Sequence, residues 1–328
     1  MMMHSRRSWL AGLAALGVLA ALPSSPALAQ ADYPNRPVRL VVGFAPGGSN
    51  DIVARLLAER LQKLFGQPVV VDNKPGAGGA VAAAFVKSQP ADGYTLMVGA
   101  SGAMVVGPAI GAPATYDTLG DFDPVSLLVT FPLVFIVNAE SPYKTLKDFV
   151  DWSKTNAENS NYASASPTFT LAAELLKLRT GASMQRVSYR GTNVAVVAVL
   201  GNQVTAAMTD TLPAMPLLKD GKLRALAVTS TARLAELPDV PTTTEAGVPN
   251  AEAVFWTGLF APKGTPKEIL SRLEAEVKTT MQAPEVQQQL RTLATDPASG
   301  TPAEFTDRIK ADLKVWGEVA KAANVTME

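Results

Sequence analysis

Two glycine-rich segments are the parts of this sequence best suited to bind a ligand. Residues 43–51 contain Gly47 and Gly48, and residues 73–79 are a second segment of the same kind. Glycine lets backbone N–H groups approach a bound group closely, and the N-terminus of a following helix carries partial positive charge. Each segment is therefore typical of an anion-binding site.

The source of positive charge in these segments is limited. Residues 44–51 contain no Lys or Arg, and Lys74 is the single cation of residues 73–79. We therefore predict that backbone donors, and no side-chain cation, hold the anion, with Lys74 as a solvated charge. On this hypothesis Gly48 is intolerant of a side chain, because a Cβ atom or a changed φ would displace converging N–H groups.

The residue types needed for several kinds of catalysis are missing. The chain has no cysteine, and its one histidine, His4, lies in the N-terminal leader described below. Ser-His-Asp and Cys-His nucleophiles, histidine acid–base catalysis and almost every zinc site are thereby excluded for the mature protein. We expect no catalytic residue, no metal and no cofactor. An exported enzyme that uses carboxylates or lysine alone stays as an alternative.

A dinucleotide-binding fingerprint is the competing interpretation of the first segment. Residues 43–48 approach the pattern G-x-G-x-x-G with Ala45 at the second glycine, and Asp72 ends the next strand. Phe44 and Pro46 flank the position that must meet a pyrophosphate, which disfavours a dinucleotide. Asp72 is then a residue that caps a turn.

Three strand–loop–helix units position these segments. Apolar runs at 38–42, 68–72 and 94–99 are typical of buried strands, and each leads into a loop of small residues. A helix is predicted over 52–65, capped by Ser49 or Asn50 and ended by Gly66. In an α/β sheet such loops share the carboxyl edge, where ligands bind. The third loop adds Ser101 and Gly102 to the candidate site.

A second α/β unit spans residues of about 135–250. The hydroxyl-rich stretch 161–170 precedes a helix predicted over 171–179, and 187–193 precede another over 194–200. Helix capping and turn formation explain each hydroxyl taken singly. Taken together they favour a polar wall that faces a ligand. Its candidate residues are Ser164, Ser166, Thr168 and Thr192, with Arg190 and Asp210 as contacts or as ordinary surface charges.

The order of the elements predicts two domains. Strand-like runs at 123–129 and 133–137 flank a hinge at 130–132, and the chain returns through an aromatic strand at 254–262. Three amphipathic helices with capping-box starts at Thr265 and Thr301 follow that strand. We predict a discontinuous first domain of residues 30–132 and 254–328, and a second domain of residues 133–253.

The N-terminus has the features of an export signal. Arg6 and Arg7 precede an apolar run at 9–22, and Ala27 and Ala29 form an A-x-A cleavage site. We expect residues 1–29 to be removed near Ala29 after Sec export, with the twin-arginine route and an uncleaved anchor as alternatives. Basic and acidic residues balance at 29 each without long like-charge blocks, so we expect neither nucleic acid nor membrane as a partner.

Several motifs resemble one protein family along essentially the whole chain. They are residues 33–38, 46–51, 71–79, 90–94, 189–191, 221–230, 237–242 and 258–262. The chain resembles the substrate-binding proteins of tripartite tricarboxylate transporters, the Bug family. The resemblance implies an α/β, two-domain periplasmic-binding-protein (Venus flytrap) fold, each domain a mixed, mostly parallel sheet flanked by helices. It also implies a monomer that delivers a small carboxylate to a membrane permease, with a sensor protein as the alternative partner.

The resemblance also implies which residues contact the ligand. Two loops, 44–51 and 76–79, would hold one ligand carboxylate through backbone amides and ordered water. Four further segments, 101–103, 164–170, 189–192 and 209–211, would complete the pocket. Family members often carry a Gly-Ser-rich loop and a histidine before the helix at 171, where this chain is two residues shorter and has Thr170. The identity of the carboxylate stays open. The expected ligand-binding residues are Phe44, Ala45, Gly47, Gly48, Ser49, Asp51, Gly76, Ala77, Gly78, Gly79, Ser101, Gly102, Ser164, Ser166, Thr168, Arg190, Thr192 and Asp210.

Overall fold

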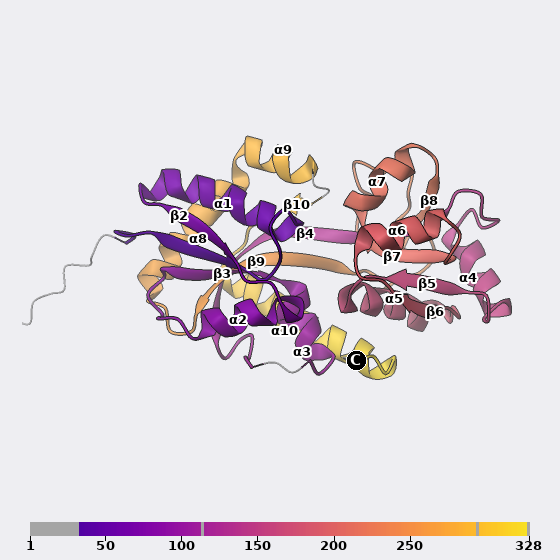
Figure 1. The fold of residues 1–328 in the computed structure, drawn as a ribbon, viewed down its shortest axis with the longest axis horizontal. Helices are drawn as coiled ribbons and strands as arrows, with labels where there is room; N and C mark the ends of the chain where they lie inside the picture. The colour runs from indigo at the N-terminus through magenta and orange to yellow at the C-terminus, as the bar shows by residue number, and fades with distance from the viewer. Residues whose placement is uncertain (1–32, 113–114, 293–294, 327–328) are drawn as a thin grey trace, which may run out of the picture.

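The molecule has two lobes side by side, joined by extended strands (Figure 1). The computed structural model describes residues 33–112, 115–292 and 295–326. The predicted signal peptide and its cleavage near Ala29 lie outside these ranges. Within them, none of the helices combines the length and the apolar character needed to cross a bilayer.

The first lobe is built on a mixed sheet. Three parallel strands lie in the order β2-β1-β3, followed by antiparallel β9 and the first part of β4, and short β10 pairs with β4. The bounds are β1 Val38–Val42, β2 Val69–Asn73, β3 Thr95–Ala100, β4 Phe122–Asn138, β9 Val254–Pro262 and β10 Asp296–Pro297. The three predicted strands are thus confirmed, with two of the three loops at one edge of the sheet. The predicted third loop is wrong, because β3 runs to Ala100 and leads directly into helical turns that contain Ser101 and Gly102.

The second lobe continues from the far end of β4. There β4 pairs with antiparallel β7 and β8, and parallel β5 and β6 extend the sheet beyond β7. The bounds are β5 Asn161–Ser164, β6 Gln185–Ser188, β7 Ala206–Asp210 and β8 Leu223–Val228. Each lobe therefore has the mixed α/β sheet that the sequence predicts.

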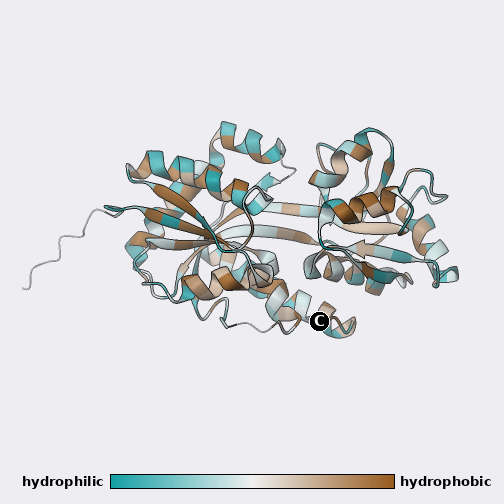
Figure 2. Ribbon diagram, in the orientation of Figure 1, coloured by the Kyte–Doolittle hydropathy of each residue, from teal (hydrophilic) through white to brown (hydrophobic). Residues whose placement is uncertain are grey.

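Helices cover the faces of both sheets, and the strands beneath them are largely apolar (Figure 2). The bounds are α1 Ser49–Phe65, α2 Ala80–Lys87, α3 Gly107–Ala109, α4 Leu146–Thr155, α5 Pro167–Thr180, α6 Thr192–Leu200, α7 Thr211–Lys219, α8 Lys267–Gln282, α9 Pro284–Thr292 and α10 Pro302–Ala322. Short turns of 3-10 and π helix occupy Ala77–Gly79 (η1) and Gly102–Val106 (η2). The buried rings of Trp256, Phe260 and Phe305 pack α10 onto β9.

The prediction of two strands with a hinge at 130–132 is wrong, because β4 is one continuous strand from Phe122 to Asn138. Pro132 pairs with Val254 of β9, and Leu133 pairs with Asp210 of β7. The fixed φ of proline is compatible with an extended backbone, so the strand changes partner at this residue without a break.

Thr229 ties together the two segments that cross between the lobes. Its buried hydroxyl accepts a hydrogen bond from the N–H of Leu133 at 2.7 Å and donates one to the carbonyl of Ala253 at 2.7 Å. Its own backbone N–H and carbonyl bond the same two residues. Thr229, which directly follows β8, therefore connects the two segments that cross between the lobes.

Several helix starts differ from the sequence predictions. Helix α5 begins at Pro167, four residues before the predicted start, because Ser166 caps it by accepting from the N–H of Phe169 at 3.3 Å. Helix α1 has Gly48 as its N-cap, with no side-chain cap from Ser49 or Asn50. Thr265 does not cap α8, whereas the capping box of Thr301 is confirmed. Thr168 thereby moves from a loop into a first helical turn.

Candidate functional site

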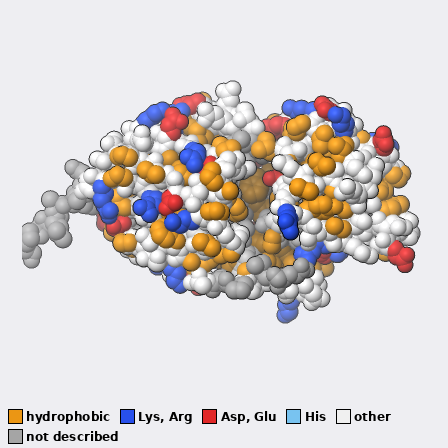
Figure 3. Space-filling view, in the orientation of Figure 1, with side chains coloured by type: hydrophobic (Ala, Val, Ile, Leu, Met, Phe, Trp, Pro, Cys, Tyr) orange, Lys and Arg blue, Asp and Glu red, His pale blue; other side chains and the backbone are white. Residues whose placement is uncertain are grey.

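A cavity of about 610 Å³ lies between the two lobes. Figure 3 shows it as a deep hollow with apolar atoms on its floor. Its walls come from both lobes and from the strands that join them. The residues that line it are Phe44, Gly48, Ser49, Asn50, Val53, Ala77, Gly78, Ala80, Ala100, Ser101, Gly102, Ala103, Gly107, Pro108, Ile110, Ala112, Tyr116, Val129, Phe131, Ala165, Ser166, Pro167, Thr168, Phe169, Thr192, Asp210, Thr211, Leu212, Thr257 and Thr295.

Five helices start at the wall of this cavity. The lining includes first-turn residues of α1, α2, α5, α6 and α7, which come from both lobes. These residues are Ser49, Asn50, Ala80, Pro167, Thr168, Phe169, Thr192, Thr211 and Leu212. No Lys or Arg occurs among the described lining residues. Positive potential in the cavity thus comes from helix N-termini, which attract anions.

The first glycine loop is held in shape by Asp51, which is buried beneath it. The Asp51 carboxylate accepts from the Gly47 N–H at 2.8 Å, from Arg55 Nε at 2.9 Å and from Asn73 Nδ2 at 2.9 Å. Asn73 also donates to the Phe44 carbonyl at 3.0 Å. Burial alone would raise the pKa of Asp51, but the bonds from Arg55, Gly47 and Asn73 outweigh it and lower this pKa. The Asp51–Asn73 pair therefore fixes one glycine loop to the strand that leads into the other.

The two glycine loops also touch directly. A Cβ atom at Gly43 would lie 2.6 Å from Gly79 Cα, and Gly79 has a φ of +105° that side-chain-bearing residues rarely adopt. Gly48 differs, because its φ is −79° and a Cβ atom there would meet nothing closer than the Ala45 carbonyl at 3.7 Å. The expected intolerance of Gly48 to any side chain is therefore wrong in its physical reason, and the close approach belongs to Gly43 and Gly79.

Lys74 lies away from the cavity lining. Its Nζ is 3.5 Å from Asp72 and lies over the ring of Phe85, 4.2 Å from the ring centroid. This position fits the prediction that Lys74 does not hold the anion, which stays a prediction to be tested.

Aromatic rings make much of the apolar surface of the cavity. Phe44, Phe131 and Phe169 line it from the first lobe, from β4 and from α5. Tyr116 donates its hydroxyl to the Ala103 carbonyl at 2.6 Å, and burial raises its pKa to about 12. Tyr116 therefore stays neutral at physiological pH. The lining suits a ligand with an apolar body.

The second lobe contributes hydroxyl groups. Thr168 lies close to the first lobe, because a Cβ atom at Gly102 would sit 3.2 Å from Thr168 Oγ1. Thr211 Oγ1 is buried and has no hydrogen-bond partner among the described residues. Ser164 instead shares a 2.8 Å hydrogen bond with Thr170 and does not line the cavity. Thr168 and Thr192 line the cavity, as does the α5 cap Ser166, whereas the Thr211 hydroxyl is buried.

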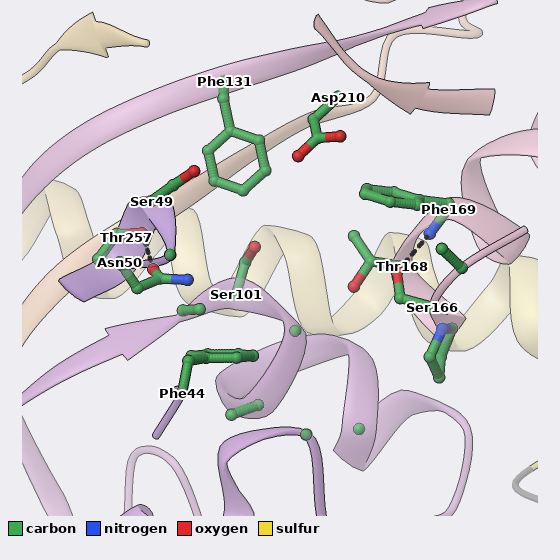
Figure 4. A pocket seen from close by; sticks show the side chains of 18 of the residues that line it. Phe44, Ser49, Asn50, Ser101, Phe131, Ser166, Thr168, Phe169, Asp210 and Thr257 are labelled. Atoms are coloured by element: carbon green, nitrogen blue, oxygen red, sulfur yellow. Dashed lines mark hydrogen bonds between the residues drawn. The ribbon is translucent and has the colours of Figure 1, made fainter. Parts of the chain in front are cut away.

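Asp210 ends β7 at the start of α7 and points into the cavity between Phe131 and Phe169 (Figure 4). Its carboxylate accepts from Thr209 Oγ1 at 3.2 Å and makes no cap bond to α7. Burial raises the pKa of Asp210, although the bond from Thr209 partly offsets this rise. Asp210 is the one charged side chain among the described lining residues.

The expected site residues divide into two groups. Those that line the cavity are Phe44, Gly48, Ser49, Ala77, Gly78, Ser101, Gly102, Ser166, Thr168, Thr192 and Asp210. Those that do not are Ala45, Gly47, Asp51, Gly76, Gly79, Ser164 and Arg190. Asp51 and Gly79 support the loops from behind, whereas Arg190 is exposed. Across the described ranges, no three acidic or histidine side chains gather as a metal site would require.

The sequence analysis included Asn50, Phe169 and Thr211 in its candidate segments without naming them as contacts, and it missed Phe131 and Thr257. Thr257 donates to Asn50 Oδ1 at 2.6 Å, which joins β9 to the start of α1. Thr257 and Phe131 lie inside strands, where no turn residue signals a site. Phe169 and Thr211 could have been found from their positions in the first turns of helices that follow candidate strands.

A family model described as the tripartite tricarboxylate transporter family receptor matches residues 53–325. The Bordetella pertussis protein BugT is 33% identical over 320 residues, covering 96% of this chain and 98% of BugT. Most of the chain is thus similar to proteins of one family along nearly their full length.

Solved structures agree in fold. A protein of R. palustris solved with adipate has a TM-score of 0.80 and 33% identity, covering 90% of this chain and 99% of that one. MatC from Rhodopseudomonas palustris with bound malate has a TM-score of 0.75 and 32% identity, covering 88% and 99%. The periplasmic binding protein BugD has a TM-score of 0.74 and 32% identity, covering 90% and 100%.

Proposed function

The chain belongs to the tripartite tricarboxylate transporter receptor family, whose members are substrate-binding proteins of transporters and not enzymes, and on this premise we propose that it captures a small organic carboxylate between its lobes. The bound acid is then handed to the membrane subunits of a tripartite transporter. Adipate and malate in similar structures support the carboxylate class.

The convergence of five helix N-termini on a cavity without described Lys or Arg is the observation that carries this proposal. The loops around Gly48 and Gly78 and the starts of α1 and α2 supply backbone N–H groups from the first lobe. Such groups bind a carboxylate by charge-assisted hydrogen bonds, which are stronger than neutral ones. The apolar rings then contact the body of the acid.

We propose the remaining details on the same basis. The lining residues among those expected from the sequence contact the ligand, and Asp51 and Gly79 support them. Residues 30–132 and 254–328 form one domain and 133–253 the other, in keeping with the change of strand partner at Pro132 and Leu133. The protein is exported, cleaved near Ala29, monomeric, and has no nucleic-acid partner.

Calorimetry on the processed protein tests the function. Acids recovered by mass spectrometry from the denatured protein are titrated back, and each is compared with its neutral amide. We expect the acid to bind, to be recovered unchanged after hours, and to bind at least about tenfold more tightly than the amide, since the amide loses a charge-assisted bond. Equal binding of acid and amide, or conversion of the acid, would refute the proposal.

A further inference from the structure

Asp210 places a carboxyl group in a cavity that otherwise has the features of an anion-binding site. The described lining contains no other charged side chain, and Tyr116 is the only other titratable one. The nearest cations in sequence on either side, Arg190 and Lys219, do not line the cavity. Among the residues that the structure describes, no Lys or Arg lines the cavity beside Asp210.

The glycine loops and Asp210 belong to different walls of the cavity. The loops around Gly48 and Gly78 lie in the first lobe, whereas Asp210 pairs with Leu133 where β4 enters the second lobe. Figure 4 shows Asp210 apart from Phe44 and Ser49, with Phe131 beside it. A ligand carboxylate held by the glycine loops would therefore leave the opposite end of the ligand near Asp210.

A carboxylate in such surroundings selects for a hydrogen-bond donor. An ionised Asp accepts but cannot donate, and a second anion beside it is repelled more strongly in a partly desolvated site than in water. Thr211 follows Asp210 in the lining, but its Oγ1 is buried. Asp210 is therefore the group that presents a hydrogen-bond acceptor to the remote end of the ligand.

We propose, on the basis of the function above, that the ligand is a monocarboxylate whose remote end carries a hydroxyl or amino group that donates to Asp210. The body between the two ends is aliphatic or aromatic and contacts Phe44, Phe131 and Phe169. Dicarboxylates are disfavoured, because their second carboxylate would lie beside Asp210.

The test compares acids that differ only at the remote end. The full-length processed protein is titrated by calorimetry at about pH 7.5 with ω-hydroxy, ω-amino and ω-carboxy acids of equal length, from four to eight carbons, and with para-substituted benzoates. At the length that fits best, we expect the hydroxy or amino acid to bind at least about tenfold more tightly than the dicarboxylate.

A charge-neutral variant shows whether Asp210 causes this preference. In Asp210→Asn we expect the ratio between the donor-bearing acid and the dicarboxylate to fall at least about fivefold. Asp220→Asn is the matched control, because Asp220 is an exposed acid that follows α7, and it should leave the ratio unchanged.

The outcomes separate this inference from the function beneath it. A dicarboxylate that binds as tightly as its hydroxy and amino counterparts at every length would overturn the inference and leave carboxylate capture intact. An unchanged ratio in Asp210→Asn would do the same. Failure of every acid in the series to bind would instead overturn carboxylate capture.

Discussion

The two walls of the cavity differ in what they offer a ligand. The first lobe presents backbone groups of glycine loops, held by the Asp51–Asn73 hydrogen bonds and by the contact of Gly43 with Gly79. The second lobe presents side chains, chiefly Thr168, Thr192 and Asp210, on the first turns of helices or beside them. A mutation usually changes one side chain and leaves the backbone geometry of a loop nearly unchanged. The backbone groups of the first lobe therefore suit the carboxylate that all expected ligands share. The side chains of the second lobe suit the part of the ligand that differs from one acid to another.

The contact between Gly43 and Gly79 offers the strongest way to break the first wall. Gly43→Ala forces the loops apart, because its Cβ atom would lie 2.6 Å from Gly79 Cα. We expect unfolding to become easier by about 1–3 kcal/mol and affinity to fall roughly a hundredfold, as two charge-assisted bonds are lost. Thermal unfolding and calorimetry measure both effects.

Gly191→Ala is the control for this variant. Gly191 does not line the cavity, its backbone is extended and the added Cβ atom meets nothing within 4 Å, so affinity and stability should change little. A loss of affinity in Gly43→Ala no larger than in Gly191→Ala would show that the contact between the loops is unimportant for binding.

Asp51→Asn weakens the same wall from beneath. The amide replaces one acceptor oxygen with a donor that faces the Gly47 N–H or Arg55, so we expect a loss of about 1–3 kcal/mol in stability and about tenfold in affinity. Calorimetry and denaturant unfolding measure these losses. A variant that binds as the wild type does would mean that the loop keeps its shape without Asp51.

The stability difference between wild type and Asp51→Asn should depend on pH. Hydrogen bonds lower the folded-state pKa of Asp51 below its unfolded value, despite burial. Its contribution to stability is therefore complete well above about pH 4 and is lost as pH falls through the folded-state pKa. Denaturant unfolding between about pH 7 and pH 3 should show the two proteins converging at the acid end; a constant difference would contradict this assignment.

The second wall should respond to smaller changes. Thr168→Val keeps the shape of the side chain and removes the hydroxyl near Gly102, so we expect a two- to tenfold loss of affinity, about 0.5–1.5 kcal/mol. Thr170→Val is the control, because Thr170 bonds Ser164 and does not line the cavity. Equal losses of affinity in the two variants would mean that Thr168 acts only on the fold.

The smallest effect is expected from the cations. Lys74→Ala and Arg190→Ala remove charges that do not line the cavity, so affinity should stay within about twofold of the wild type. Calorimetry at low and moderate salt checks this. A tenfold loss in either variant would show that a side-chain cation, and not backbone N–H groups, holds the carboxylate.

The sequence predicted the first wall better than the second. Glycine, a preceding β-branched strand and a following amphipathic helix are local signals, and they located the loops around Gly48 and Gly78. The start of α5 was misplaced because Pro167 and the Ser166 cap were read as loop chemistry, although proline is favoured in a first helical turn.

Local sequence signals could not identify the cavity residues that lie inside strands. Phe131 was assigned to a hinge because it lies between two strand-like runs, yet the strand is continuous and changes partner there. Thr257 meets Asn50 only because β9 lies beside β3, a pairing between segments far apart in the chain. Pairings of this kind are set by tertiary packing and leave no local pattern.

The continuous β4 strand and its brace at Thr229 determine how the lobes can move. The segments that cross between them are hydrogen-bonded to one another or to Thr229, so neither can swivel alone about a single bond. We therefore expect any change in the angle between the lobes to twist both crossing segments together. A ligand that required such a change would use part of its binding energy to deform these paired segments.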